Sequence, residues 1–236
     1  ISLNLDLVDE ALGAVNAAGV PLMIGFNRRF DPNFAALQKR LREGAVGEIE
    51  MATIISRDPG PPPMDYVKIS GGLYRDMMIH DLDLARFLVG EDFVTVSALG
   101  ASLVDKAIGE AGDVDTAAVQ MQTASGKICV ITNSRRASYG YDQRIEVHGS
   151  KGMLRAGNVH NTTVELATAE GFREDPILHF FTERYGQAYA NEVLSFIDAV
   201  TNGSPISPNG IDGLKAQQLA DAATESWKTG KPVKVA

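Results

Sequence analysis

Three features are scarce in this 236-residue sequence: cysteine, net positive charge and long apolar runs. Cys129 is the only cysteine, so no internal disulfide can form, and its apolar neighbours predict an inert thiol in a buried strand. A net charge of −8 argues against a nucleic-acid surface, which needs clustered basic residues. No run approaches the roughly 20 apolar residues of a membrane span, and the first ten residues lack the features of a signal peptide. We therefore expect a cytoplasmic protein that binds neither nucleic acid nor membranes.

The glycine fingerprint GxGxxG, which cradles a pyrophosphate at a helix N-terminus, is also absent. The sequence starts with Ile1, and residues 5–18 carry apolar positions three and four apart, as on one face of a helix. The apolar run at 21–26 predicts a parallel strand buried on both faces. One helix and one strand make only a single crossover of an α/β sheet. We therefore expect the chain to be a fragment that lacks the preceding strands.

The pattern from residue 31 onward predicts a sheet flanked by helices. Helices are expected at 32–43, 73–89, 182–202 and 210–229, and strands at 48–55, 94–99, 117–123, 127–133, 144–148, 153–156 and 163–167. Tight turns at 124–126 and 149–152 imply antiparallel pairing of neighbouring strands.

The predicted fold class is α/β, with two parts. Residues 1–30 are expected to be the C-terminal remnant of a Rossmann domain, and residues 31–236 an α+β domain. That second domain would hold a large, mostly antiparallel open sheet covered by helices on one face. Because the other sheet face also carries apolar residues, we expect a homo-oligomer, a dimer or tetramer, formed through it.

One segment carries the main candidates for chemistry. Asp76, His80 and Asp83 are spaced four and three residues apart, which places them on one stripe of a helix that follows Gly71 and Gly72. A carboxylate one turn before an imidazole can orient the ring and stabilise its protonated form, as a general acid or base requires. Two other interpretations stay open: an ordinary surface pair, or two ligands of a metal site that no nearby cluster completes.

Other candidates lie at the ends of predicted strands. Asn27, Arg28 and Arg29 follow the 21–26 run, where they can meet a cofactor phosphate or carboxylate or remain solvated charges at a domain junction. The polar loop that holds Arg135, Arg136, Tyr139 and Tyr141 can hydrogen-bond a polyhydroxy ligand. The remaining histidines, His148, His160 and His179, are interpreted as packing residues.

Several of these motifs resemble the Gfo/Idh/MocA oxidoreductase family, and within it the bacterial inositol dehydrogenases. The segment GGLYRDMMIHDLD at 71–83 is similar to the family's catalytic helix, and GFNRRFDP at 25–32 to its last Rossmann strand and domain crossover. GSKG at 149–152 and FFTERY at 180–185 are similar to later family segments. The resemblance covers essentially the whole chain from Leu3 onward.

The resemblance implies hydride transfer between a sugar or cyclitol carbon and NAD or NADP bound to a Rossmann domain. His80 would take the hydroxyl proton, Asp76 would orient it, and no metal would take part. Asn27 and Arg28 would border the nicotinamide. The expected substrate contacts are Arg57, Tyr141, Asp76 and His80.

The family's third catalytic group is a lysine in a Glu-Lys-Pro motif, which would lie just before Ile1. The chain alone is therefore expected to be inactive. Two alternatives remain: a non-catalytic sugar-binding or assembly module of the same fold, and a metal-dependent isomerase with Asp76 and His80 as ligands.

Overall fold

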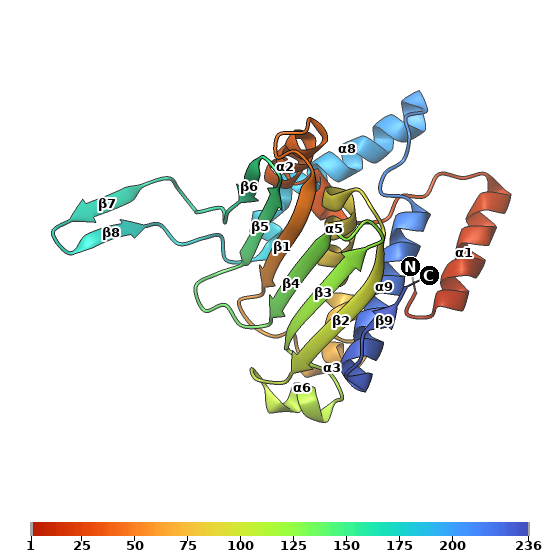
Figure 1. Ribbon diagram of the computed structural model, residues 1–236, viewed down its shortest axis with the longest axis horizontal. Coiled ribbons are helices and arrows are strands. Elements are labelled where there is room, and N and C mark those ends of the chain that lie inside the picture. The colour runs from red at the N-terminus through yellow and green to blue at the C-terminus, as the bar shows by residue number, and fades with distance from the viewer. Residues whose placement is uncertain (1, 236) are drawn as a thin grey trace.

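A computed structural model describes residues 2–235, and within them a seven-stranded sheet forms the centre of the molecule (Figure 1). Its strands are β1 Ile49–Arg57, β2 Phe93–Ala101, β3 Thr116–Thr123, β4 Ile128–Ser134, β5 Asp142–Gly149, β6 Gly152–Ala156 and β9 Val233–Lys234. The spatial order is β6-β5-β1-β4-β3-β2-β9. β1 and β4 run parallel, and every other neighbouring pair is antiparallel. The prediction of a large, mostly antiparallel sheet is confirmed.

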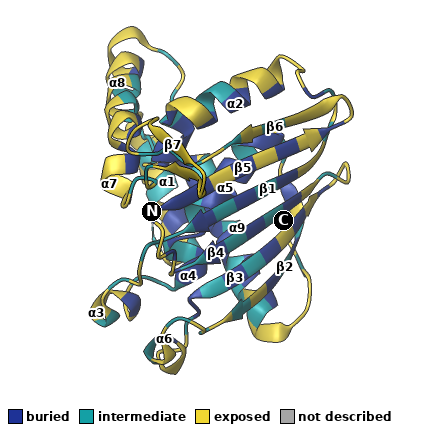
Figure 2. Ribbon diagram, turned by 90° about the vertical axis from the view of Figure 1, so that its left-hand side faces the viewer, coloured by how far each residue is buried: buried dark blue, intermediate teal, exposed yellow. Residues whose placement is uncertain are grey.

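Helices cover one face of this sheet and leave the other open, as Figure 2 shows. The longer helices are α1 Leu5–Ala18, α2 Pro32–Arg42, α5 Ile79–Val89, α8 Gly186–Asn202 and α9 Gly210–Thr229. The shorter ones are the 3-10 turn η1 Asn27–Phe30, α3 Met64–Val67, α4 Leu73–Asp76, α6 Lys106–Glu110 and α7 Phe181–Arg184. α9 packs on β2, and α5 packs on both α9 and β1.

The period of two in the strands explains why only one face is covered. In β1, Ala52 and Ile54 point into the helical layer and are at most 1% exposed, whereas Met51 on the other face is 43% exposed. In β4, Cys129 and Ile131 are fully buried by the same helices. Burying each large aliphatic side chain contributes about 1.5–3 kcal/mol, so the core forms on the helical side.

The structure corrects four predicted elements. Residues 21–26 form no strand. Among the described residues, their backbone bonds outside the segment are one to a distant residue, from Ile24 N–H to Pro208 O, and one local turn, from Arg29 N–H to Phe26 O. The helix predicted over 182–202 is split at Tyr185 into α7 and α8. The strand expected at 163–167 is only the first half of a hairpin, β7 Glu165–Thr168 and β8 Gly171–Glu174.

The fourth correction concerns the helix predicted over 73–89. The Met78 N–H donates to Leu73 O, five residues back, instead of to the carbonyl four residues back. This wider turn separates α4 from α5, and such turns are frequent at functional sites. Asp76 therefore closes one helix and His80 lies in the first turn of the next.

Candidate active site

A cavity of about 530 Å³ lies where β1 and β4 end, a volume typical of small-molecule sites. Segments far apart in the sequence form its wall. They contribute Asn27, Arg28, Asp58, residues 60–63, Tyr66, Asp76, Met77, His80, Arg135, Tyr141, Phe180, Phe181, Tyr185 and Tyr189. The structure thus brings Asp76, His80, Asn27, Arg28 and Tyr141 to one place, as expected from the sequence.

His80 presents a neutral imidazole to this cavity. Burial and the nearby Arg28 cation lower its pKa to about 4, and the charge of Asp76 opposes this shift only in part. The ring contacts Phe26 edge to face at 5.9 Å between centroids. Its Nδ1 is buried and has no hydrogen-bond partner among the described residues. His80 thus lines the cavity while its buried nitrogen lacks the hydrogen-bond partner that buried polar atoms normally have.

Asp76 is held by two other residues. Tyr66 donates its hydroxyl to one carboxylate oxygen at 2.6 Å, and Arg135 donates a guanidinium N–H to the other at 2.7 Å. Asp76 makes no described hydrogen bond to the His80 ring, but its charge raises the pKa of that ring and so favours the charged form, as predicted. The carboxylate acts on the ring only through its field, because the wide turn at Met78 separates the two helices.

Arg135 joins two carboxylates on the cavity wall. It is 3% exposed, and besides Asp76 it contacts Asp58 at 3.4 Å. Burial raises the pKa of Asp58 to about 6, although Arg135 and Arg28 both work against this rise. The wall therefore offers a carboxylate, a cation and a carboxyl group close to its titration point, all suited to bind a polyhydroxy molecule.

The two adjacent arginines of η1 have separate protein partners. Arg28 forms a buried ion pair with Asp81 and donates to the Ser56 hydroxyl at 3.1 Å. Burial alone would lower the pKa of Arg28, but the neighbouring acidic groups, Asp81 first among them, raise it above its usual value. Arg28 still lines the cavity, yet its charge is compensated within the protein. Asn27 differs, because its buried side-chain N–H₂ group has no hydrogen-bond partner within residues 2–235.

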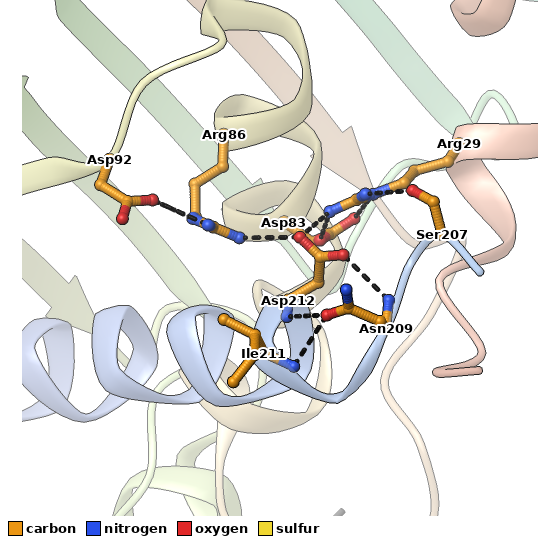
Figure 3. Close-up of polar contacts among 8 residues, drawn as sticks. All are labelled: Arg29, Asp83, Arg86, Asp92, Ser207, Asn209, Ile211 and Asp212. Carbon is orange, nitrogen blue, oxygen red and sulfur yellow. Dashed lines mark hydrogen bonds and ion pairs between the residues drawn. The ribbon is translucent and has the colours of Figure 1, made fainter. Parts of the chain in front are cut away.

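Arg29 lies outside the cavity and anchors α5 to the start of α9 (Figure 3). It binds Asp83 through two nitrogens at 2.8 and 2.5 Å, Asp212 at 2.9 Å and the Ser207 hydroxyl at 3.2 Å. Arg86 joins the same carboxylate, Asp212, at 3.3 Å. Asp83 therefore belongs to a structural ion-pair network. It shares α5 with His80, three residues away, whereas Asp76 ends the separate helix α4.

Arg57, predicted to contact the substrate, does not line this cavity. It lies on the open face of the sheet, where its guanidinium binds Tyr139 at 3.0 Å and Asp142 at 3.3 Å. It lines a separate hollow on that face together with Leu99, Ala118 and Trp227. The reason is the strand period: Ser56 points toward the helices, so Arg57 must point away from them.

Some of the other polar candidates line the cavity, and the rest bind protein groups elsewhere. Arg135 and Tyr141 line the cavity, whereas Arg136 binds the Val104 carbonyl at 2.6 Å and Tyr139 binds Asp142 at 2.6 Å. None of His148, His160 and His179 lines the cavity. His148 lies 3.3 Å from Glu50, and His160 binds the Asp175 carbonyl oxygen at 2.6 Å.

Several cavity residues escaped the sequence prediction, chiefly Asp58, Tyr66 and Tyr185. The triple-proline loop at 61–63 was a usable signal, because a stiff loop after a strand end often borders a ligand site. Tyr185 ends the family-like FFTERY segment, but that resemblance gives it no place in the cavity. It is 1% exposed and meets the Tyr141 ring edge to face at 5.8 Å.

Among residues 2–235, no three His, Cys, Asp or Glu side chains gather closely enough to hold a metal ion. Likewise, no helix in this part of the chain combines the length and apolar character of a membrane span.

The chain as a whole is similar to several named enzymes. The family described as "Oxidoreductase family, C-terminal alpha/beta domain" (Gfo/Idh/MocA) matches residues 38–235. Inositol 2-dehydrogenase of Rhizobium meliloti strain 1021 is 53% identical over 236 residues, 100% of this chain and 72% of that protein. The crystal structure of a myo-inositol dehydrogenase from Corynebacterium glutamicum has a TM-score of 0.95 at 45% identity, covering 100% of this chain and 71% of that one. A scyllo-inositol dehydrogenase from Lactobacillus casei with bound NAD(H) and scyllo-inositol has a TM-score of 0.89 at 27% identity, covering 98% and 70%.

Proposed function

The chain belongs to the Gfo/Idh/MocA oxidoreductase family, and on that basis we propose that its cavity binds a cyclitol and supports NAD-dependent oxidation of one ring hydroxyl to a ketone. The observation that carries this proposal is the neutral His80 in the cavity wall, whose buried Nδ1 has no hydrogen-bond partner in the described part of the chain. A cavity rich in carboxylate, guanidinium and tyrosine groups suits a ligand made of hydroxyls.

Oxidation of a secondary alcohol removes a hydride from carbon and a proton from oxygen. When bound, the nicotinamide supplies the hydride acceptor. His80 accepts the hydroxyl proton, because its lowered pKa keeps the ring neutral at pH 7. Asp76 adds a negative charge near the ring, which favours the imidazolium that forms, and Tyr66 and Arg135 hold that carboxylate in place.

The residues of η1 fit the edge of a nicotinamide site. Asn27 is 5% exposed, and its free N–H₂ group suits a carbonyl acceptor such as the carboxamide of the cofactor. Arg28 keeps a compensated positive charge beside the imidazole. We assign NAD over NADP, supported by the NAD(H) present in the L. casei structure.

The assignment of His80 is tested by mutation in the protein that carries this chain. His80→Ala is expected to lower inositol-dependent NADH formation about 10²–10⁴-fold, as for loss of a general base. His148→Ala is the matched control, because that ring lies on the open sheet face away from the cavity. A His80→Ala enzyme with a near-normal rate would reject the role.

Three further assignments belong to this proposal. Residues 31–236 form the substrate-binding part, supported by the family match over 38–235, and residues 1–30 belong with a dinucleotide-binding part. The open sheet face mediates a homo-oligomer, supported by exposed Met51 and Leu99. The protein acts in the cytoplasm, which fits a lone buried thiol at Cys129.

A further inference from the structure

The loop that leads from β1 to α4 carries a tyrosine on the wall of the cavity. Residues 60–63 of this loop and Tyr66 line the cavity. Three consecutive prolines at 61–63 stiffen the loop, and the short helix α3 that follows them lies beside α6 at the edge of the molecule (Figure 2). The hydroxyl of Tyr66 therefore reaches Asp76 from a segment that has few other contacts with the body of the protein.

Tyr66 makes the polar connection between this loop and the body. Its hydroxyl donates to the carboxylate of Asp76 at 2.6 Å. Within residues 2–235, this is the one hydrogen bond that joins residues 59–69 to a residue beyond Ser70. An apolar contact adds to it, because Val67 is only 5% exposed. The loop and the Asp76 side chain are thus held together by a single hydroxyl.

The hydrogen bond between Tyr66 and Asp76 is of the charge-assisted kind. A hydroxyl that donates to a carboxylate typically lies 2.5–2.7 Å away, and such bonds are roughly twice as strong as neutral ones. This bond, and after it burial, raises the pKa of Tyr66 above its usual value. The phenol therefore stays protonated at neutral pH and remains a donor to Asp76.

Of the two partners of Asp76, Tyr66 is the one that can leave. Arg135 is 3% exposed and lies between Asp76 and Asp58, so moving it would leave a buried cation without its full compensation. Tyr66 is neutral and 46% exposed, so water can replace the carboxylate as its partner. An exchange of partners at Asp76 therefore involves the tyrosine and leaves the arginine in place.

The group that gains from such an exchange is His80. Both oxygens of Asp76 have a described partner, whereas the buried Nδ1 of His80 has none within residues 2–235. Two charged groups act on the pKa of the ring: Arg28 lowers it together with burial, and Asp76 raises it. A hydrogen bond from Tyr66 neutralises part of the carboxylate charge and fixes its direction. It therefore weakens the effect of Asp76 on the ring.

We propose that Tyr66 is a positioning residue that competes with His80 for the carboxylate of Asp76 and so keeps the ring neutral until it accepts a proton. This role rests on the proposed function, in which His80 takes the hydroxyl proton. Once the ring is protonated, release of Tyr66 frees one oxygen of Asp76 to stabilise the imidazolium. The same release removes the polar connection of the loop at 59–69, so proton transfer and loop movement are coupled.

The first test is made without substrate or cofactor, in the protein that carries this chain. Tyr66→Phe removes only the hydroxyl, and the pKa of His80, followed by ¹⁵N NMR, is expected to rise from about 4 by about 1 unit. Tyr139→Phe is the matched control. Tyr139 also donates to a carboxylate at 2.6 Å and is 52% exposed, but it does not line the cavity. The same pKa of His80 in the two variants would overturn the proposal.

The second test separates competition from entry of water. A loosened loop would also raise the pKa of His80 if it admitted water to the cavity. Competition acts through the carboxylate, so adding Tyr66→Phe to Asp76→Asn is expected to change the pKa of His80 by less than about 0.3 unit. A rise as large as that in the wild-type background would assign the shift to water and overturn the proposal.

The third test uses turnover and distinguishes this role from the proposed chemistry. In Tyr66→Phe the acid limb of kcat/KM for inositol oxidation is expected to move to higher pH by the same amount as the pKa of His80, because the free enzyme needs a neutral base. Loss of turnover in His80→Ala without any movement of the limb in Tyr66→Phe would overturn the competition and leave the proposed function standing. Normal turnover in His80→Ala would overturn both.

Discussion

The titration of His80 offers the sharpest check on the electrostatics of the cavity. Its pKa is lowered from 6.5 to about 4, chiefly by burial and next by the Arg28 cation. A difference of about 2.5 units corresponds to about 3 kcal/mol against the charged ring. At pH 5.5 an ordinary imidazole is about 90% protonated, whereas His80 is expected to be about 3% protonated.

The sign of the effect on stability follows from where protons bind. The unfolded chain protonates this histidine below about pH 6.5, but the folded chain does so only near pH 4. The contribution of His80 to the free energy of unfolding is therefore complete above pH 6.5 and is lost as the pH falls toward 4. Asp58 has the opposite effect on the free energy of unfolding. Because its pKa is raised from 3.8 to about 6 in the folded chain, its contribution is present at low pH and is lost as the pH rises from 3.8 to about 6. The two effects offset each other in a global unfolding curve.

A site-specific assay is therefore required. Imidazole ¹⁵N chemical shifts, followed from pH 7 to pH 3.5, report each ring separately, and His80→Gln assigns the signal. Asp76→Asn is expected to lower the pKa of His80 only slightly, since Asp76 is the smallest of the three contributions. Titration of His80 at pH 6 or above would refute this reasoning. A fall of more than one unit in the Asp76→Asn variant would instead indicate a direct hydrogen bond between the two side chains.

Two other predictions concern the buried charges. Arg29→Met leaves Asp83 buried without its partner and is expected to lower the free energy of unfolding by about 3–5 kcal/mol in urea titrations. Lys39→Met breaks an exposed ion pair and is expected to lower it by less than about 1 kcal/mol. Similar losses in the two variants would contradict the assigned network. Arg135→Gln removes a cation that lowers the pKa of Asp58 against the effect of burial. The pKa of Asp58 is therefore expected to rise above about 6, measured by ¹³C carboxyl NMR. An unchanged pKa would show that the 3.4 Å contact with Arg135 has little electrostatic effect.

Local patterns in the sequence were sufficient for most of the fold. Alternation along residues 48–55 and 127–133 predicted β1 and β4, and the spacing of apolar residues predicted α2 and α9. These features depend on the fixed period of a strand or a helix, which each segment shows in its own sequence without information from the rest of the chain. The residues 21–26 show the limit of this reasoning. An apolar run resembles a strand, but hydrogen bonds to a neighbouring strand are needed to make it one.

The sequence by itself determined that an aspartate and a histidine stand near a glycine pair, next to a strand-rich domain with one open face. Only the tertiary structure decided which partners each charge meets. Arg28 and Arg29 find Asp81 and Asp83 at separations of 53 and 54 residues along the chain, and Asp76 finds Arg135 at 59. Helical spacing reports which residues share a face, but it contains no information about the distant segment that packs there. For that reason the candidate groups were visible in the sequence, whereas the neutral state of His80 and the ion pair that holds Asp76 were not.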